Sequence, residues 1–136
     1  MYEGSCLCGA VQFEIIGKIR NIVHCHCSQC RKAQGTAFAT NGNVKTSDLK
    51  ILSGEDKLTG YASSPDQTKY FCKVCGSPII SKSKLNPDEV RIRVGAISSD
   101  IEERPIAHIF VTSKANWEEI TGDLPQYESH EPGRIK

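Results

Sequence analysis

The chain has 136 residues, of which 38% are apolar and 24% are charged, with a net charge of +1. This length fits one globular domain, and the balanced charge gives no reason to expect a nucleic-acid or membrane partner. The chain starts without a basic region followed by an apolar run, so we expect no secretory signal and a cytoplasmic location. In that reducing compartment, seven cysteines indicate metal ligands rather than disulfides.

Short strands dominate the expected secondary structure. Residues 11–15 and 90–94 alternate between apolar and polar side chains, which predicts half-buried strands. Weaker patterns predict strands at 22–25, 50–52, 58–62, 68–72, 78–81 and 106–112. Glycine, asparagine and proline predict turns at 41–43, 53–55, 64–66 and 86–88.

One short helix interrupts these strands. We expect it to begin with Ser28 as N-cap, to run to about Gln34 and to end at Gly35. Trp117 is expected to be a core residue. The sequence therefore predicts a mainly β fold of antiparallel strands, with a single zinc domain over residues 1–120 and a polar tail over 121–136.

Four of the cysteines form two close pairs that are remote in sequence. Cys6 and Cys8 are two residues apart, so on a strand both can face one metal ion, and Cys72 and Cys75 form a Cys-x-x-Cys turn. Gly9 and Gly76 follow directly and suit such turns, because glycine allows positive φ. Two such pairs predict a closed, structural four-cysteine zinc site.

The remaining cysteines, Cys25, Cys27 and Cys30, offer three thiolates without an obvious fourth ligand. In an extended segment, Cys25 and Cys27 face one way while His24 and His26 face the other. Three protein ligands and an open position are typical of a catalytic zinc. Other interpretations stay open: buried apolar thiols, a structural site closed by His26, and an iron–sulfur cluster.

The cysteine motifs resemble those of the glutathione-dependent formaldehyde-activating enzyme (GFA) family, whose domain is shared with centromere protein V. The similarity covers nearly the whole chain and includes all seven cysteines. It is carried by Gly4–Glu14, by His24–Lys32, by Phe71–Ser77, and by a closing segment with Pro105, His108, Ile109, Trp117, Leu124, Pro125 and Tyr127.

This resemblance implies a β-tent fold of antiparallel sheets with two zinc ions per chain. It implies a structural zinc on Cys6, Cys8, Cys72 and Cys75, and a catalytic-type zinc on Cys25, Cys27 and Cys30. The family's named reaction joins glutathione and formaldehyde to S-(hydroxymethyl)glutathione, which is carbon–sulfur lyase chemistry. The implied partners are thus a small thiol and a small aldehyde. Glutathione carboxylates could pair with basic residues that could equally be surface charges, namely Arg31, Lys32, Arg91 and Arg93.

Two functions compete at this point. The first is an enzyme acting on a thiol adduct of formaldehyde or another small aldehyde. The second is a zinc-stapled binding module without chemistry. The open three-cysteine site favours the enzyme, because a binding module gains nothing from an unfilled coordination position.

Overall fold

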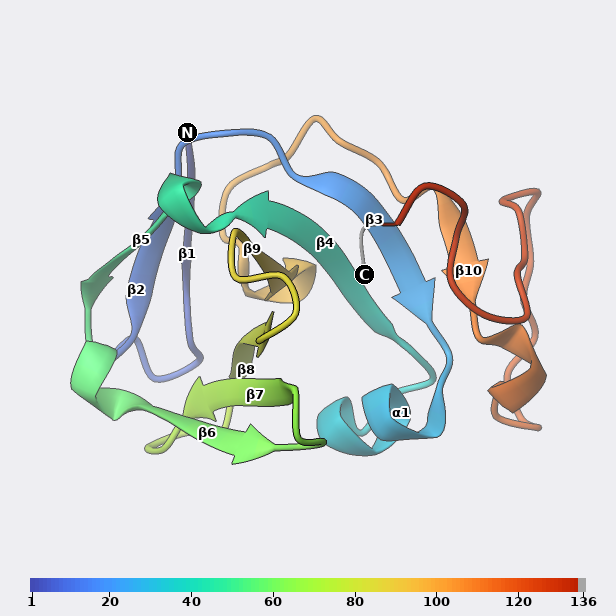
Figure 1. Ribbon diagram of the computed structural model, residues 1–136, viewed down its shortest axis with the longest axis horizontal. Coiled ribbons are helices and arrows are strands. Elements are labelled where there is room, and N and C mark those ends of the chain that lie inside the picture. Colours follow the sequence, from blue (N-terminus) through green and yellow to red (C-terminus); the bar gives the residue numbers. More distant parts are fainter. Residues whose placement is uncertain (135–136) are drawn as a thin grey trace.

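The computed structural model describes residues 1–134, which form two β-sheets and one α-helix, α1, at Ser28–Gln34. Figure 1 shows this arrangement. The strands are β1 (Tyr2–Ser5), β2 (Gln12–Ile15), β3 (Arg20–Cys25), β4 (Ala39–Lys45), β5 (Leu49–Ser53), β6 (Leu58–Ala62), β7 (Gln67–Cys72), β8 (Pro78–Ser83), β9 (Glu89–Arg93) and β10 (Ala107–Ile109). Single turns of 3₁₀ helix cover Thr46–Asp48, Glu55–Lys57, Val94–Ala96 and Val111–Ser113. The prediction of a mainly β, β-tent-type fold with one short helix is confirmed.

The two sheets differ in size. The smaller has the strand order β1-β2-β5, and the larger has the order β10-β3-β4-β9-β8-β7-β6. The paired strands are antiparallel with one exception, the parallel pairing of β10 with β3. In Figure 1 the larger sheet curves from β10 on one side of the molecule to β6 on the other. α1 follows β3, so the end of β3 and the start of α1 lie together.

The main core lies between the two sheets. Phe13 and Ile15 come from β2, and Val44, Val90 and Ile92 come from β4 and β9 of the larger sheet; all are buried. Alternation along β9 places Arg91 and Arg93 on the opposite face of that sheet. The larger sheet thus has one apolar face, which packs on the smaller sheet, and one face that carries polar side chains.

The strands expected from alternation are present, and two further strands were missed. β1 was not predicted, and the turn predicted at 41–43 is wrong, because Asn41, Gly42 and Asn43 lie in the middle of β4. Asn41 and Asn43 accept hydrogen bonds from Arg93 and Arg91 of β9. A Cβ on Gly42 would lie 2.4 Å from Ile19 Cγ2, so glycine is needed here for a close approach rather than for a turn.

The helix has the predicted extent but a different cap. Its N-cap is Cys27 rather than Ser28, because the Cys27 Sγ accepts a hydrogen bond from the Cys30 N–H at 3.3 Å. Gly35 ends the helix with a φ of 67°, as predicted. No helix within residues 1–134 is long and apolar enough to cross a membrane.

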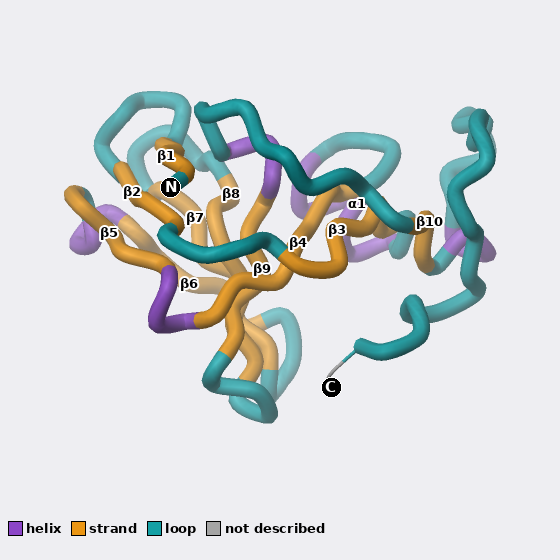
Figure 2. The backbone as a smooth tube through the Cα atoms, turned by 90° about the horizontal axis from the view of Figure 1, so that it is seen from above, coloured by secondary structure: helices purple, strands orange, loops and turns teal. Residues whose placement is uncertain are grey.

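The segment after β10 runs along the outer edge of the larger sheet, as Figure 2 shows beside β10. His108 of β10 forms two backbone hydrogen bonds with this segment: its N–H donates to Pro125 O, and its O accepts from the Tyr127 N–H, both at 2.9 Å. Trp117 is 68% exposed, so its predicted core position is wrong. Residues 135–136 of the predicted polar tail lie outside the described residues.

Candidate metal centres

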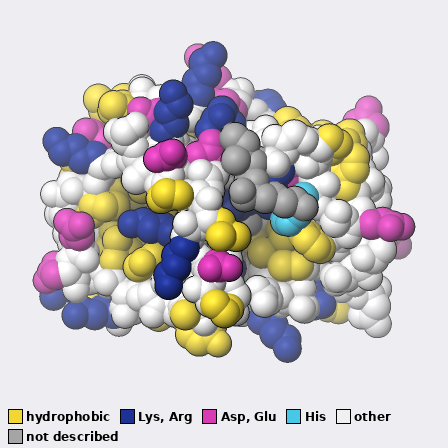
Figure 3. Space-filling view, in the orientation of Figure 1, with side chains coloured by type: hydrophobic (Ala, Val, Ile, Leu, Met, Phe, Trp, Pro, Cys, Tyr) yellow, Lys and Arg dark blue, Asp and Glu magenta, His cyan; other side chains and the backbone are white. Residues whose placement is uncertain are grey.

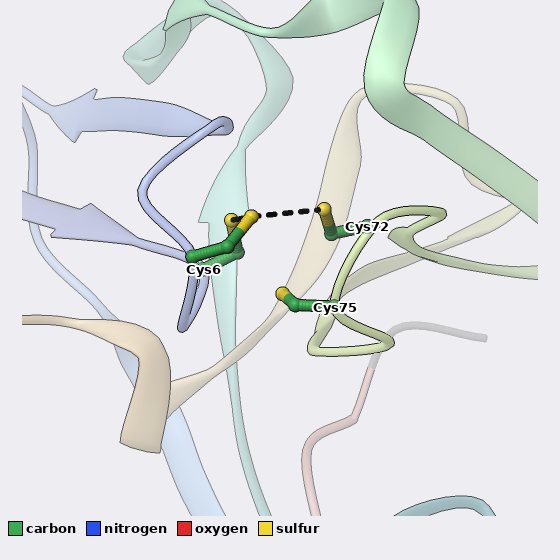
Figure 4. A group of neighbouring side chains, drawn as sticks. Cys6, Cys72 and Cys75 are labelled. Carbon is green, nitrogen blue, oxygen red and sulfur yellow. Dashed lines mark hydrogen bonds between the residues drawn. The ribbon is translucent and has the colours of Figure 1, made fainter.

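The first cysteine cluster joins two turns that are remote in sequence. Cys6 and Cys8 lie in the β1–β2 turn, while Cys72 ends β7 and Cys75 lies in the β7–β8 turn. Their four Sγ atoms lie within 4.8 Å of one another. Figure 4 shows Cys6 pointing from one turn toward Cys72 and Cys75 of the other. The structure therefore brings together all four residues predicted for this site.

Both turns are shaped by the same backbone geometry. The Gly9 N–H donates to Cys6 O at 3.1 Å, and the Gly76 N–H donates to Cys72 O at 2.7 Å. Gly9 and Gly76 have φ values of 80° and 82°, in the left-handed region that glycine adopts without strain. Cys6 and Cys8 were expected to share a face of a strand, but they lie in this turn instead. The turn directs both thiols toward Cys72 and Cys75.

The spacing of these sulfurs fits a tetrahedral metal. A zinc–sulfur distance of about 2.3 Å gives sulfurs about 3.8 Å apart at the corners of a tetrahedron. The Cys6–Cys8 and Cys8–Cys72 Sγ distances are 3.6 and 3.8 Å. A hydrogen bond with the Ser77 hydroxyl lowers the pKa of Cys75, which favours its thiolate, while desolvation and the neighbouring thiols raise the pKa of Cys8. Four thiols in this arrangement could hold one zinc ion.

The second cluster is local in sequence. Cys25 ends β3, Cys27 caps α1, and Cys30 lies in the first turn of that helix. Their Sγ atoms also lie within 4.8 Å of one another, and Cys27 is the most accessible of the three. Within residues 1–134, neither histidine nor carboxylate joins this group. The cluster therefore offers a metal ion three soft ligands and leaves a tetrahedral position free.

The neighbouring histidines form a separate cluster behind β3. His26 is fully buried, with its Nε2 2.9 Å from His108 Nδ1, and His24 Nδ1 lies 2.9 Å from Thr40 Oγ1. Phe38 lies against both, with ring centroids 4.5 Å from His24 and 5.0 Å from His26. Burial lowers the pKa of His26 to about 4, so this ring is neutral near pH 7. In this arrangement His26 does not complete the three-cysteine cluster.

The three thiols of the second cluster interact through hydrogen bonds. Hydrogen bonds from the Cys25 and Cys30 thiols lower the pKa of Cys27, while the hydrogen bond to Cys27 raises the pKa of Cys25. The positive charge of Lys69 acts in the same direction on Cys27. These hydrogen bonds and this charge all favour the thiolate form of Cys27.

Arg93 lies close enough to this cluster to interact electrostatically with its three sulfurs. Its burial lowers the pKa of the guanidinium, and the negative charges of Cys30, Cys25 and Cys27 raise it. The side chain is 5% exposed, and its Nη1 donates to Asn41 Oδ1 at 2.9 Å. A buried cation beside three thiols offsets part of the negative charge that they gather.

The sequence located both cysteine clusters but left Arg91 and Arg93 undecided between substrate contacts and surface charges. Arg93 is buried, and Arg91 is half-buried with its Nη1 donating to Asn43 Oδ1 at 3.2 Å. The sequence does contain a pattern that could have indicated these contacts: Arg-x-Arg in 91–93 and Asn-x-Asn in 41–43 have the same spacing, so the two arginines can bind the two asparagines across paired strands. On the face of the molecule in Figure 3, by contrast, basic and acidic side chains are interspersed.

Comparisons with known proteins identify one family. The model of the glutathione-dependent formaldehyde-activating enzyme family matches residues 1–113. A Halomonas elongata protein, provisionally named as such an enzyme, is 30% identical over 128 residues, which cover 88% of this chain and 81% of that protein. An uncharacterised lyase of Schizosaccharomyces pombe is 34% identical over 78 residues, which cover 57% of this chain and 55% of that protein.

A solved structure shares the fold. The crystal structure of a Rhodobacter sphaeroides protein matches with a TM-score of 0.61 and 28% sequence identity, covering 74% of this chain and 91% of that chain. The family match spans both cysteine clusters, which the fold places at the junctions described above. The chain belongs to the glutathione-dependent formaldehyde-activating enzyme family.

Proposed function

We propose that the chain is a zinc-dependent carbon–sulfur lyase of the S-(hydroxymethyl)glutathione synthase type. It joins a small thiol such as glutathione to formaldehyde or another small aldehyde, and catalyses the reverse reaction. The observation that carries this proposal is the clustering of Cys25, Cys27 and Cys30 without a fourth protein ligand in the described chain. The names of the family and of the Halomonas elongata relative supply the thiol and the aldehyde.

The reaction needs no redox partner. A C–S bond forms between the thiol sulfur and the carbonyl carbon, and the proton lost by the thiol ends on the former carbonyl oxygen. The difficult requirements are an ionised sulfur near neutral pH and its placement beside the carbonyl. A zinc ion on the three cysteines would supply an open coordination position that favours a thiolate.

The protein's own groups in this proposal set the charge and the access of the site. Cys25, Cys27 and Cys30 present their sulfurs together at the β3–α1 junction, where Cys27 remains partly accessible. Arg93 and Lys69 place positive charge near these sulfurs. This positive charge favours an approaching thiolate over a neutral thiol. The four cysteines Cys6, Cys8, Cys72 and Cys75 are assigned a structural zinc, because they leave no coordination position free.

Exchange NMR with ¹³C-formaldehyde and glutathione tests this function. The zinc-loaded protein is expected to raise the rate of S-(hydroxymethyl)glutathione formation and breakdown above the uncatalysed rate. Cys27→Ser should remove this acceleration while the protein remains folded. An unchanged exchange rate with fully loaded, folded protein would overturn the enzyme and leave the alternative, a zinc-stapled binding module.

A second experiment tests whether the sulfur of the thiol substrate coordinates the metal. With cobalt in the three-cysteine site, added glutathione should strengthen the thiolate-to-metal charge-transfer band. S-methylglutathione cannot ionise at sulfur, so it should cause a much smaller change. Equal responses to the two compounds would contradict coordination through the thiol.

A further inference from the structure

A cavity of about 210 Å³ opens on the polar face of the larger sheet. Its lining includes Asn43 of β4, Ser81 of β8 and Glu89 and Arg91 of β9, together with Arg134. Pockets that bury a whole drug-sized ligand have volumes of roughly 300–1,000 Å³. This cavity is therefore suited to one end of a substrate.

The cavity and the three-cysteine cluster lie on the same face of the sheet. Strand register places Lys69, Ser81, Arg91 and Asn43 in one row across β7, β8, β9 and β4. The next row carries Arg93 opposite Asn41, and Cys25 lies beyond it on β3. Arg91 and Arg93 are two residues apart on one strand, so their Cα atoms are separated by about 7 Å. A line of positive charge thus runs from the cavity to the cysteines.

Both guanidiniums are held in place by neutral side chains rather than by ion pairs. Arg91 and Arg93 donate to the neutral side-chain oxygens of Asn43 and Asn41, at 3.2 and 2.9 Å. The ion pairs in residues 1–134 are Arg20–Glu89, Lys57–Asp56 and Arg134–Glu131, and neither arginine takes part in one. The Arg93 Nε is buried and lacks a hydrogen-bond partner in the described chain.

Such an arrangement is costly in a protein without a ligand. A buried cation normally has a carboxylate partner, because desolvation disfavours its charge. Burial lowers the pKa of Arg91 to about 10, so the group still carries its charge at neutral pH. A preorganised, unpaired guanidinium at a cavity is a ready site for an anion, and its planar fork matches a carboxylate.

We propose that Arg91 binds a carboxylate of the thiol substrate in this cavity, while Arg93 lies between that carboxylate and the three cysteines. The thiol substrate then lies with its sulfur toward Cys25, Cys27 and Cys30. This inference rests on the proposed function for the direction of the sulfur. Glu89 lines the cavity, and Glu131 lies near enough to act on Arg91. Their negative charges repel a phosphate dianion more strongly than a singly charged carboxylate, so a carboxylate fits the cavity better.

The test measures binding of S-methylglutathione, whose sulfur is blocked, by isothermal titration calorimetry on the full chain. Arg91→Gln is expected to weaken binding by about tenfold or more, since a charge-assisted pair is lost. Arg91→Lys keeps the positive charge but lacks the planar guanidinium, so its affinity for the probe should lie between those of the wild type and Arg91→Gln.

Lys82→Gln is the matched control. Lys82 is on β8, the strand beside that of Arg91, but it points to the opposite face of the sheet, with its Nζ 5.3 Å from the Tyr70 ring centroid. Removing this charge should leave binding unchanged. The diethyl ester of S-methylglutathione needs no variant and should bind the wild type about tenfold more weakly. Circular dichroism of each variant separates lost binding from lost folding.

Three results would overturn the inference: equal binding by folded Arg91→Gln, equal binding of the ester, or absence of binding at millimolar probe. Competition at constant ionic strength checks the ligand class, and stronger displacement by inorganic phosphate than by acetate would overturn the carboxylate. Arg91-dependent binding without accelerated formaldehyde exchange would leave the carboxylate site standing and overturn the proposed function. The two failures are therefore distinguishable.

Discussion

The two cysteine clusters use the same ligand chemistry in opposite structural contexts. Cys6 and Cys8 meet Cys72 and Cys75 across more than 60 residues of chain, where the β1–β2 turn of the smaller sheet faces the β7–β8 turn of the larger one. Cys25, Cys27 and Cys30 span only six positions at one strand–helix junction. We therefore expect ligand separation in sequence, rather than ligand type, to decide whether a bound metal supports the fold.

The largest expected effect follows from breaking the long-range cluster. Cys72 is fully buried and belongs to the main core, so we expect Cys72→Ser to prevent stable folding. Structural zinc contributes about 10–16 kcal/mol of apparent binding free energy, comparable with the whole stability of a domain. Thermal melts followed by circular dichroism measure this effect.

Cys27→Ser is the matched control for that experiment. Serine can accept the same capping hydrogen bond from the Cys30 N–H, so helix α1 keeps its N-cap. We expect this variant to melt within a few degrees of the wild type. Equal losses in the two variants would contradict the division into a structural and a local site.

Removal of metal with a chelator should distinguish the two clusters without a mutation. The three-cysteine site offers one ligand fewer and an open position through which a chelator can enter. Stepwise titration should therefore release one zinc per chain first while the fold persists, and the second only with unfolding. Metal release is measured with a colorimetric indicator and folding by circular dichroism, and joint release would contradict the comparison.

Two glycines give a matched pair of smaller effects. Gly76 follows the Cys72–Cys75 turn with a φ of 82°, and Gly35 ends α1 with a φ of 67°; a Cβ would meet no atom within 4 Å at either position. Alanine should thus cost only backbone strain, about 1 kcal/mol, or roughly 3–6 °C in Tm. We expect a larger loss for Gly76→Ala, because the strain also displaces metal ligands; a larger loss for Gly35→Ala would contradict this.

The smallest effect concerns hydrogen bonds between residues that are remote in sequence and that involve no metal ligand. Glu103 accepts hydrogen bonds from the Tyr2 hydroxyl and from the Ile19 N–H. Burial raises the pKa of this carboxyl, but the hydrogen bonds outweigh it and hold the pKa below 4.5. The folded state thus favours the carboxylate, so the stabilisation is complete above pH 4.5 and is lost as the pH falls through the lowered value.

Glu103→Gln should therefore cost about 1 kcal/mol near pH 7 and progressively less toward acid pH. Urea unfolding at several pH values measures this difference. A cost that does not change with pH would show that the charge of Glu103 is irrelevant.

The cysteine clusters were predictable because their evidence is local. Spacing alone grouped Cys6 with Cys8 and Cys72 with Cys75, and alternation separated Cys25 and Cys27 from the histidines between and before them. The strands with apolar alternation, such as β2 and β9, were equally visible, since one side of each faces the core.

The remaining features depend on long-range contacts. Asn41-Gly42-Asn43 has the composition of a turn, yet Arg91 and Arg93 hold both asparagines and Ile19 packs over the glycine, which makes this segment a central strand. Likewise, the parallel pairing of β10 with β3 joins residues more than 80 positions apart. Turn propensity and local periodicity carry no information about such partners.

The span of the four-cysteine cluster also has a consequence for synthesis of the chain on the ribosome. All ligands of the local site exist once residue 30 has been made, whereas the other site lacks a ligand until residue 75. At about 5–20 residues per second, the 45 residues between these positions take roughly 2–9 s. Throughout that interval the nascent chain would present Cys6 and Cys8 without their partners. Capture of an ion by all four cysteines would therefore have to wait until β7 and the turn after it have been made.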